Sequence, residues 1–235
     1  MQFENYTNLK QAVAQYAQDK TYFQITELKL ALKAAEVPFS DESVKKYLYQ
    51  LKKADRLFDA GRGWYSNIPQ PFVLDTRPVQ EIAEIIRRAF PLLNFCCWNT
   101  AQLQSYFHHL PGKNLFFVYA EKEGLNAVFE YLHEHNPNSY LNPQKRDIER
   151  SFRVTDNAIV VRPAISEEPK NGDYATIEKI LVDLFIERIK LDLFDEWEYM
   201  RLLKTIVTQY RIDMAGLVRY AGRREVKEKM IKMIH

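Results

Sequence analysis

Two of the seven glycines in this 235-residue chain flank a single arginine in the segment RLFDAGRGWYS, residues 56–66. Glycine adopts positive φ angles without steric cost, so Gly61 and Gly63 favour a tight hairpin tip that carries Arg62. β-prone stretches lie on both sides of the tip, and Trp64 and Tyr65 begin the returning one. The segment therefore predicts a β-hairpin whose aromatic side chains hold its second strand against the preceding helices.

Three helices are predicted before this hairpin, over residues 7–19, 26–36 and 41–56, with a short strand at 22–25 between the first two. This order is that of a winged helix-turn-helix domain, which would occupy residues 1–67. The segment IPQP follows at 68–71, and its prolines stop both helices and central strands. We therefore predict a domain boundary there and a second domain over residues 72–235.

The second domain alternates strand-like and helix-like segments. The strand candidates are FVLD (72–75), NFCCWN (94–99), LFFVYA (115–120) and AIVVRP (158–163), and the helix candidates between them are 77–90, 101–110 and 124–135. Three further helical stretches close the chain, at 176–190, 195–210 and 224–234. The chain as a whole is therefore predicted to be mixed α/β, with a small, mostly parallel sheet and a helical C-terminal part.

The composition indicates a protein with real hydrophobic cores and no membrane segment. Hydrophobic residues make up 46% of the chain, and no apolar run approaches the roughly 18 residues that span a bilayer. The N-terminus has no apolar stretch typical of a secretory signal. Cys96 and Cys97 are neighbours in a predicted strand, where their side chains point to opposite faces, so no disulfide between them is expected. We expect a reduced, cytoplasmic protein.

The third predicted helix has the charge of an element that lies against nucleic acid. Residues 43–53 carry four lysines and no acid, whereas the first 39 residues carry four bases and four acids. Base contacts suit Ser43, Lys46 and Gln50. Phosphate contacts suit Lys45, Lys52 and Lys53, and Arg62 would reach a phosphate or the minor groove. The candidate DNA-binding residues are Ser43, Lys45, Lys46, Tyr49, Gln50, Lys52, Lys53 and Arg62. Because residues 1–70 carry a net charge of only +2, tight binding would need a dimer, repeated sites or the second domain.

A second concentration of basic residues lies at the C-terminus. Residues 219–235 contain six lysines and arginines and two glutamates. Val226, Met230 and Met233 form one apolar stripe, so we expect a helix that packs on the second domain with its bases outward. The candidate second basic surface consists of Arg219, Arg223, Arg224 and Lys227. The alternative is a solvated terminal helix without a binding role.

Neither a catalytic site nor a metal or cofactor site is predicted. Acids follow two predicted strands at Asp75, Glu121 and Glu123, and such acids usually cap helices or face solvent. The paired histidines at 108–109 and 133–135 lack the i, i+4 spacing of ligands on one helix face. In the segment 176–185 the core stripe is Ile177, Ile180, Leu181 and Leu184; Glu178 and Asp183 fall mostly off it, and Glu178 and Lys179 are expected in a buried ion pair. A magnesium-dependent nuclease delivered by the winged helix, and a protein-interaction module, are the alternatives to a non-enzymatic DNA-binding protein.

Two segments, VKKYLYQLKKADRLFDAGRGWYS (44–66) and TIEKILVDLF (176–185), resemble the AbiEi-type antitoxins of abortive-infection, type IV toxin–antitoxin pairs. The resemblance implies an N-terminal domain that binds inverted repeats in its own promoter and a C-terminal domain associated with antitoxicity. It also implies that the functional partner is a nucleotidyltransferase-like toxin, which the antitoxin opposes without forming a stable complex with it. The expected function is that of a sequence-specific regulator that binds double-stranded DNA, an autoregulating antitoxin in phage defence.

Overall fold

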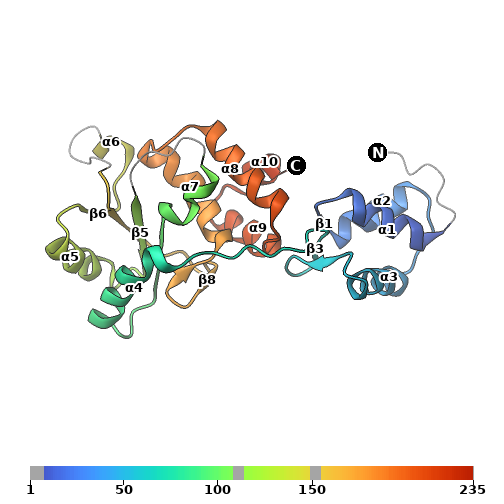
Figure 1. Ribbon diagram of the computed structural model, residues 1–235, viewed down its shortest axis with the longest axis horizontal. Helices are drawn as coiled ribbons and strands as arrows, with labels where there is room; N and C mark the ends of the chain where they lie inside the picture. The colour runs from blue at the N-terminus through green and yellow to red at the C-terminus, as the bar shows by residue number, and fades with distance from the viewer. Residues whose placement is uncertain (1–7, 108–113, 149–154, 235) are drawn as a thin grey trace. The chain divides into compact units, whose positions relative to one another are not determined.

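The computed structural model describes residues 8–107, 114–148 and 155–234. The chain is mixed α/β with two sheets, and it divides into two compact units (Figure 1). Unit 1 comprises Met1–Phe72 together with Ile206–Gly216, and unit 2 comprises Val73–Thr205 together with Leu217–His235. Each unit has its own sheet and its own hydrophobic core.

The N-terminal part of unit 1, as described from residue 8 on, contains the helices α1, α2 and α3 and an antiparallel sheet of order β1-β3-β2. Its elements run in the order α1 (Leu9–Asp19), β1 (Tyr22–Gln24), α2 (Ile25–Ala34), α3 (Asp41–Lys53), β2 (Phe58–Asp59) and β3 (Trp64–Ser66). The predicted helices, the short strand and the hairpin are therefore all present, with the boundaries shifted by a few residues.

The core of unit 1 lies between the three helices and the sheet. All three helices contribute to it, and α3 does so through Val44, Leu48 and Leu51. The ring of Tyr65 stacks on Phe23 of β1, with 5.7 Å between the ring centroids, and Trp64 is buried. The two aromatic residues at the start of β3 therefore hold the returning strand against the rest of the unit, as predicted.

Residues 206–216 group with unit 1, although the sequence placed them with the second domain. The backbone N–H of Arg211 donates to the carbonyl of Gln70 at 2.7 Å, and the N–H of Phe72 donates to the carbonyl of Arg211 at 2.9 Å. These bonds form a parallel bridge next to the IPQP segment. The segment predicted to be a domain boundary is therefore paired with a distant part of the chain.

Unit 2 is built on a six-stranded sheet of order β6-β7-β5-β4-β9-β8. The pairings β6–β7, β5–β7 and β4–β9 are parallel, while β4–β5 and β8–β9 are antiparallel, which confirms a mostly parallel sheet. The elements up to the last strand are α4 (Arg77–Ala89), β4 (Phe95–Asn99), the 3-10 helix η1 (Thr100–Tyr106), β5 (Leu115–Ala120), α5 (Leu125–His135), β6 (Ser139–Leu141), α6 (Lys145–Ile148), β7 (Ala158–Pro163), β8 (Lys170–Asn171) and β9 (Tyr174–Ala175). The closing helices are α7 (Ile177–Leu191), α8 (Glu196–Gln209), α9 (Met214–Arg223) and α10 (Lys227–Ile234), and α8 and α9 have residues in both units.

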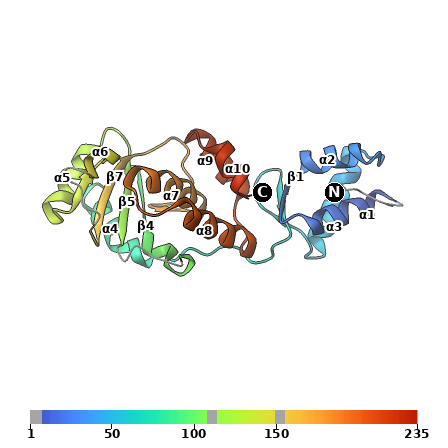
Figure 2. The same cartoon turned by 90° about the horizontal axis from the view of Figure 1, so that it is seen from above.

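Helices cover both faces of this sheet. Apolar residues of α4 and α5 pack on one face, against β4, β5 and β7. On the other face, α7 reaches the sheet through Lys179, whose ammonium group lies over the Tyr119 ring of β5, and through Glu187, which pairs with Arg162 of β7. Figures 1 and 2 show α5 and α7 on opposite sides of β5. Helix α7 therefore packs against the face of the sheet opposite α4 and α5.

Two predictions of local structure were wrong. FVLD forms no strand, and Val73 within it is 78% exposed, because no neighbouring strand pairs with it beyond the bridge at Pro71. The helix expected from residue 101 is a 3-10 helix capped by Asn99.

Some elements were not predicted. The strands β6, β8 and β9 were missed, since strands of two or three residues carry no periodic pattern. Helix α9 was missed as well, whereas the helix expected at 224–234 is present as α10, which begins after Glu225 with its positive φ of 59°.

Candidate nucleic-acid interface

Helix α3 begins at a reciprocal cap formed by two serines. The Ser40 hydroxyl accepts from the Ser43 N–H at 3.1 Å, and the Ser43 hydroxyl accepts from the Ser40 N–H at 2.9 Å. The Ser43 hydroxyl also donates to the Ser40 carbonyl at 2.8 Å. Ser43, predicted to read bases, is therefore half-buried and occupied with the helix cap.

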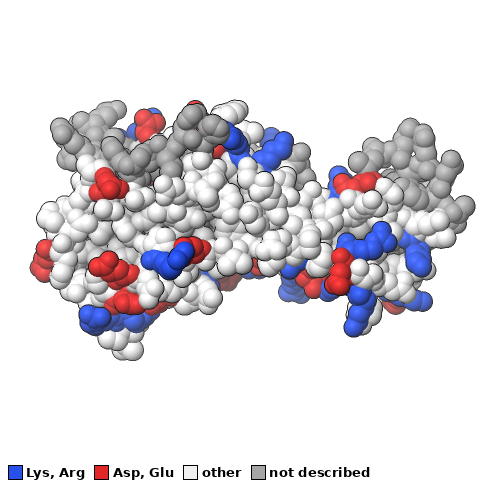
Figure 3. All heavy atoms as spheres, viewed as in Figure 1, with Lys and Arg blue, Asp and Glu red and all other residues white. Residues whose placement is uncertain are grey.

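The remaining predicted residues of α3 are mostly exposed, and they define the α3 face: Lys45, Lys46, Tyr49, Gln50 and Lys53. The Tyr49 side chain is 59% exposed, and the ammonium group of Lys53 lies 5.6 Å from the centroid of its ring. In Figure 3, blue side chains gather over the part of unit 1 that holds α3, at the lower right. The structure thus places three lysines, Tyr49 and Gln50 on one solvent-facing side of α3.

Two charges near α3 are paired within unit 1. Lys52 forms an ion pair with Asp59 of β2, so this lysine is less available to a ligand than its neighbours. Asp41 in the first turn pairs with Lys29 of α2 at 2.8 Å. The hydrogen bond from Lys29 lowers the pKa of the Asp41 carboxyl, and the charges of Lys29 and Lys45 act in the same direction. The acid that could repel phosphate at the start of α3 is therefore partly neutralised by a neighbouring lysine.

The hairpin tip has the predicted backbone. Gly61 and Gly63 have φ values of +94° and +75°, and Arg62 between them is exposed. The Trp64 N–H donates to the Gly61 carbonyl at 3.0 Å and closes the turn. One side of the tip is covered, because a Cβ atom at Gly61 would collide with the carboxylate of Asp213. The tip is therefore fixed in place while Arg62 stays accessible.

The predicted second basic surface is only partly present. Arg219 and Lys227 are exposed, on α9 and α10. Arg223 pairs with Glu167 and donates to the Ser166 hydroxyl at 2.8 Å. Arg224 is directed inward, with its Nε 3.4 Å from the Asp183 carboxylate and a side chain that is 10% exposed. The bases of this region do not all face outward, since one of the four belongs to a buried network.

That buried network surrounds Lys179 of α7. The Lys179 ammonium lies 2.9 Å from the Glu168 carboxylate and 2.8 Å from that of Asp183. It also donates to the Tyr220 hydroxyl at 2.9 Å, which in turn donates to Asp183 at 2.9 Å. The expectation of a buried ion pair at Lys179 is confirmed, but its partners are Glu168 and Asp183. Asp183 itself, expected mostly off the core stripe, is fully buried.

The network holds its charges away from solvent. Burial opposes the charged form of Lys179, but the charges of Asp183, Cys96, Tyr220 and Glu168 outweigh it and raise the pKa of this ammonium. The Cys96 thiol donates to the Glu168 carboxylate at 3.3 Å, and burial raises its pKa. Three of these residues were missed in the sequence, because Glu168, Tyr220 and Cys96 come from separate segments with no shared spacing. We assign the network a structural role, since none of its members except Arg224 has a side chain more than 5% exposed.

Both cysteines are free and buried, as the sequence predicted. The Cys97 thiol faces the other side of β4, where it donates to the Asp173 carbonyl at 3.4 Å. Burial raises the pKa of Cys97 to about 12. Neither thiol is therefore ionised near neutral pH.

Three of the acids considered for a nuclease site have local partners, whereas Glu123 is exposed. Asp75 pairs with Arg77, Glu121 accepts from the Asn94 N–H at 3.4 Å, and Glu178 accepts from the Thr176 hydroxyl. At the end of α5, His135 Nδ1 lies 2.7 Å from the Tyr131 carbonyl, as expected for a histidine that complements a helix C-terminus. His108 and His109 lie outside the described residues. Within residues 8–107, 114–148 and 155–234, no three histidine, cysteine or acidic side chains come together in a way that could hold a metal ion.

The chain belongs to a protein family described as "Family of unknown function (DUF6577)", which matches residues 43–235. The matched region covers α3 from Ser43 onward, the β2–β3 hairpin and all of unit 2. A search of curated proteins finds no match. Among the helices of the described residues, none has the length and apolar character required to cross a membrane.

Proposed function

We propose that unit 1 is a winged helix-turn-helix domain that binds double-stranded DNA, with α3 as the recognition helix and the β2–β3 hairpin as the wing. The observation that carries this proposal is the exposed α3 face, which combines three lysines with Tyr49 and Gln50. The order of elements and the β1-β3-β2 sheet support it, because this topology leaves one face of the third helix free beside a hairpin.

The side chains divide into two groups by chemistry. Lys46 and Gln50 suit base edges in the major groove, because lysine donates to guanine and glutamine forms paired hydrogen bonds with adenine. Lys45, Lys53 and Arg62 suit phosphates, which position the protein without reading sequence. Ser43 and Lys52 are secondary in this proposal, since the first caps the helix and the second pairs with Asp59.

The experiment measures DNA affinity against salt concentration. Fluorescence anisotropy with a labelled duplex from the region upstream of the gene should show binding that weakens as salt rises. Lys45→Ala and Lys53→Ala should each flatten the slope of log affinity against log salt by about 0.9, the value for one lost phosphate contact. Lys122→Ala, which removes an exposed lysine of unit 2, is the control and should leave the slope unchanged.

Base reading is tested separately from phosphate contact. Gln50→Ala should lose about 1–3 kcal/mol at the bases it reads and little on unrelated duplexes, because a bidentate contact discriminates between bases. Absence of binding at low salt, or equal slopes for the parent and both lysine variants, would refute the DNA-binding proposal.

We further propose that the protein acts as a transcriptional regulator of the AbiEi antitoxin type, with a nucleotidyltransferase-like toxin as functional partner and no catalytic activity or cofactor of its own. This proposal rests on the resemblance of residues 44–66 and 176–185. The test is co-expression with the product of the adjacent gene in a bacterial host. The full chain should restore growth if that product is toxic, and a chain that leaves a toxic product fully active would contradict the antitoxin proposal.

A further inference from the structure

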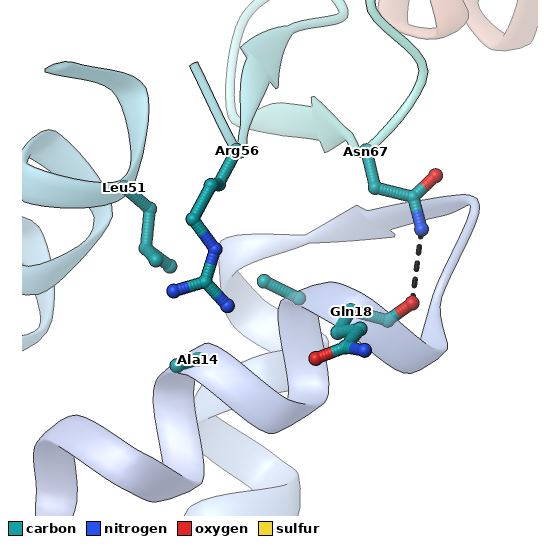
Figure 4. A pocket seen from close by; sticks show the side chains of 6 residues that line it. Ala14, Gln18, Leu51, Arg56 and Asn67 are labelled. Carbon is teal, nitrogen blue, oxygen red and sulfur yellow. Dashed lines mark hydrogen bonds between the residues drawn. The ribbon is translucent and has the colours of Figure 1, made fainter. Parts of the chain in front are cut away.

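A groove runs between α1 and α3 in unit 1, beside the α3 face. It consists of two adjoining cavities of about 300 and 250 Å³ that share Ala14, Leu51 and Arg56 as lining residues. The small or apolar side chains of Ala14, Ala17 and Leu51 line it, and Figure 4 shows Ala14 and Leu51 on either side of Arg56. The combined space is of the size of small-molecule sites, which are roughly 300–1,000 Å³ and mostly apolar.

Arg56 supplies the charge in this groove. Figure 4 shows its guanidinium between Leu51 of α3 and Ala14 of α1, with no bond to the other lining residues drawn there. No hydrogen bond or ion pair joins this guanidinium to any other residue that the structure describes. By contrast, the Asn67 amide at the same end of the groove is satisfied, because it donates to the Gln18 carbonyl at 3.0 Å. The five N–H donors of Arg56 are thus available to a ligand.

The remaining lining is basic or neutral. Lys10 of α1 is the second charged residue, while Tyr47, Gln50 and Ala54 form the wall contributed by α3. None of the lining residues is acidic. An apolar lining beside a guanidinium and an ammonium group favours a ligand with an apolar body and one carboxylate, because a guanidinium binds a carboxylate through two parallel hydrogen bonds.

We propose that this groove is a binding site for a small organic monocarboxylate, held by Arg56 at its charged end and by Ala14, Ala17 and Leu51 along its apolar body. The site differs from the DNA-binding surface in its residues, apart from Gln50, which borders both. Ligand binding does not depend on DNA binding, so the two proposals can fail independently.

The test titrates the full-length ¹⁵N-labelled protein with benzoate and with hexanoate, and follows backbone amide shifts. Both acids should cause saturable shifts at Ala14, Ala17 and Leu51. The neutral analogues benzamide and hexanamide have the same apolar bodies and should bind much more weakly. Arg56→Gln should weaken carboxylate binding by about tenfold or more, since it removes a charged hydrogen-bond donor. Lys33→Gln, an exposed lysine on α2 outside the groove, should bind like the parent.

Three results would overturn the proposal. The first is the absence of saturable shifts at these residues with either acid, and the second is equal affinity for the acids and their amides. The third is a flatter salt dependence of DNA binding in Arg56→Gln with carboxylate affinity unchanged, which would make Arg56 a phosphate contact. Because Arg56 is exposed, the variant should keep the dispersed spectrum of the folded parent.

Discussion

Gly61 and Gly63 both have a positive φ, but their surroundings differ. The effect of backbone conformation on the need for glycine can therefore be separated from the effect of close packing. A Cβ atom at Gly63 would meet no atom within 4 Å. At Gly61 it would lie 2.6 Å from the Ala215 Cβ and closer still to the Asp213 carboxylate. Only Gly61 is therefore required by packing as well as by backbone conformation.

We predict that Gly63→Ala lowers the free energy of unfolding by about 1–2 kcal/mol, the cost of a left-handed conformation for a residue with a side chain. Gly61→Ala should cost a further 1–3 kcal/mol, roughly the range for overpacking a closed site. Urea unfolding of the two variants provides the measurement, with Gly63→Ala as the matched control. Equal losses would show that Asp213 and Ala215 do not cover the tip.

At the scale of one element, α7 carries charged residues in the middle of unit 2. We predict that Asp183→Asn lowers the free energy of unfolding by about 3–5 kcal/mol, because it leaves Lys179 and Arg224 without the carboxylate they share. Asp192→Asn is the control on the same helix. Asp192 is exposed at the C-cap with φ of 50°, which asparagine tolerates, so its change should stay within about 0.5 kcal/mol. A loss in Asp183→Asn as small as in this control would contradict a buried network at α7.

The same network predicts instability at alkaline pH. The pKa values of Lys179 and Tyr220 in the folded protein are raised above the ordinary values of 10.5 and 10.0. The stabilisation that these two groups give the folded state is therefore complete below their ordinary pKa values, and it is lost as the pH rises through their folded-state pKa values. The free energy of unfolding should begin to fall near pH 9, because the buried thiols of Cys96 and Cys97 keep their protons above the ordinary pKa of 9.0, and should fall more steeply above about pH 10, where Lys179 and Tyr220 add to the loss. Urea unfolding at stepped pH measures this, and Tyr220→Phe should show a smaller alkaline loss than the parent.

At the scale of the whole molecule, the pairing of residues 206–216 with the IPQP segment changes where the chain is open to proteases. Arg211 donates from Nη1 to the Ile68 and Pro69 carbonyls at 3.1 and 3.0 Å, and its guanidinium covers the Phe58 ring. We therefore predict first cleavage within residues 73–76, where Val73 is exposed, and protection of residues 68–72. Mass spectrometry of early fragments gives the measurement. Arg211→Ala should expose residues 68–72 to cleavage, whereas the control Lys122→Ala should give the same early fragments as the parent. Early cleavage at residues 68–72 in the parent would show that the pairing of Arg211 with the IPQP segment is not stable.

The sequence by itself determined the local features of this protein. The apolar spacing of α1, α2 and α3, the two positive-φ glycines and the opposite faces of Cys96 and Cys97 all depend on residues close together in the chain. Their geometry follows from helix and strand periodicity and from backbone sterics. The buried strands β4, β5 and β7 were recognisable for the same reason, since each is a continuous apolar run bounded by turns.

Only the tertiary structure decided which distant segments meet. Residues 206–216 pair with the IPQP segment through backbone hydrogen bonds and through the Arg211 guanidinium, which donates to backbone carbonyls. A single arginine about 140 residues away forms no spacing pattern with IPQP, so the sequence does not mark this pairing. Asp183 was expected mostly off the core stripe of its helix, and Arg224 was expected to face outward, because charged side chains are usually solvated. Asp183 is inside because Lys179, four residues earlier on the same helix, and Arg224 lie against its carboxylate, and the Tyr220 hydroxyl donates to it. The i, i+4 spacing of Lys179 and Asp183 is visible in the sequence, but Glu168, Tyr220 and Arg224 come from other segments and carry no local signature.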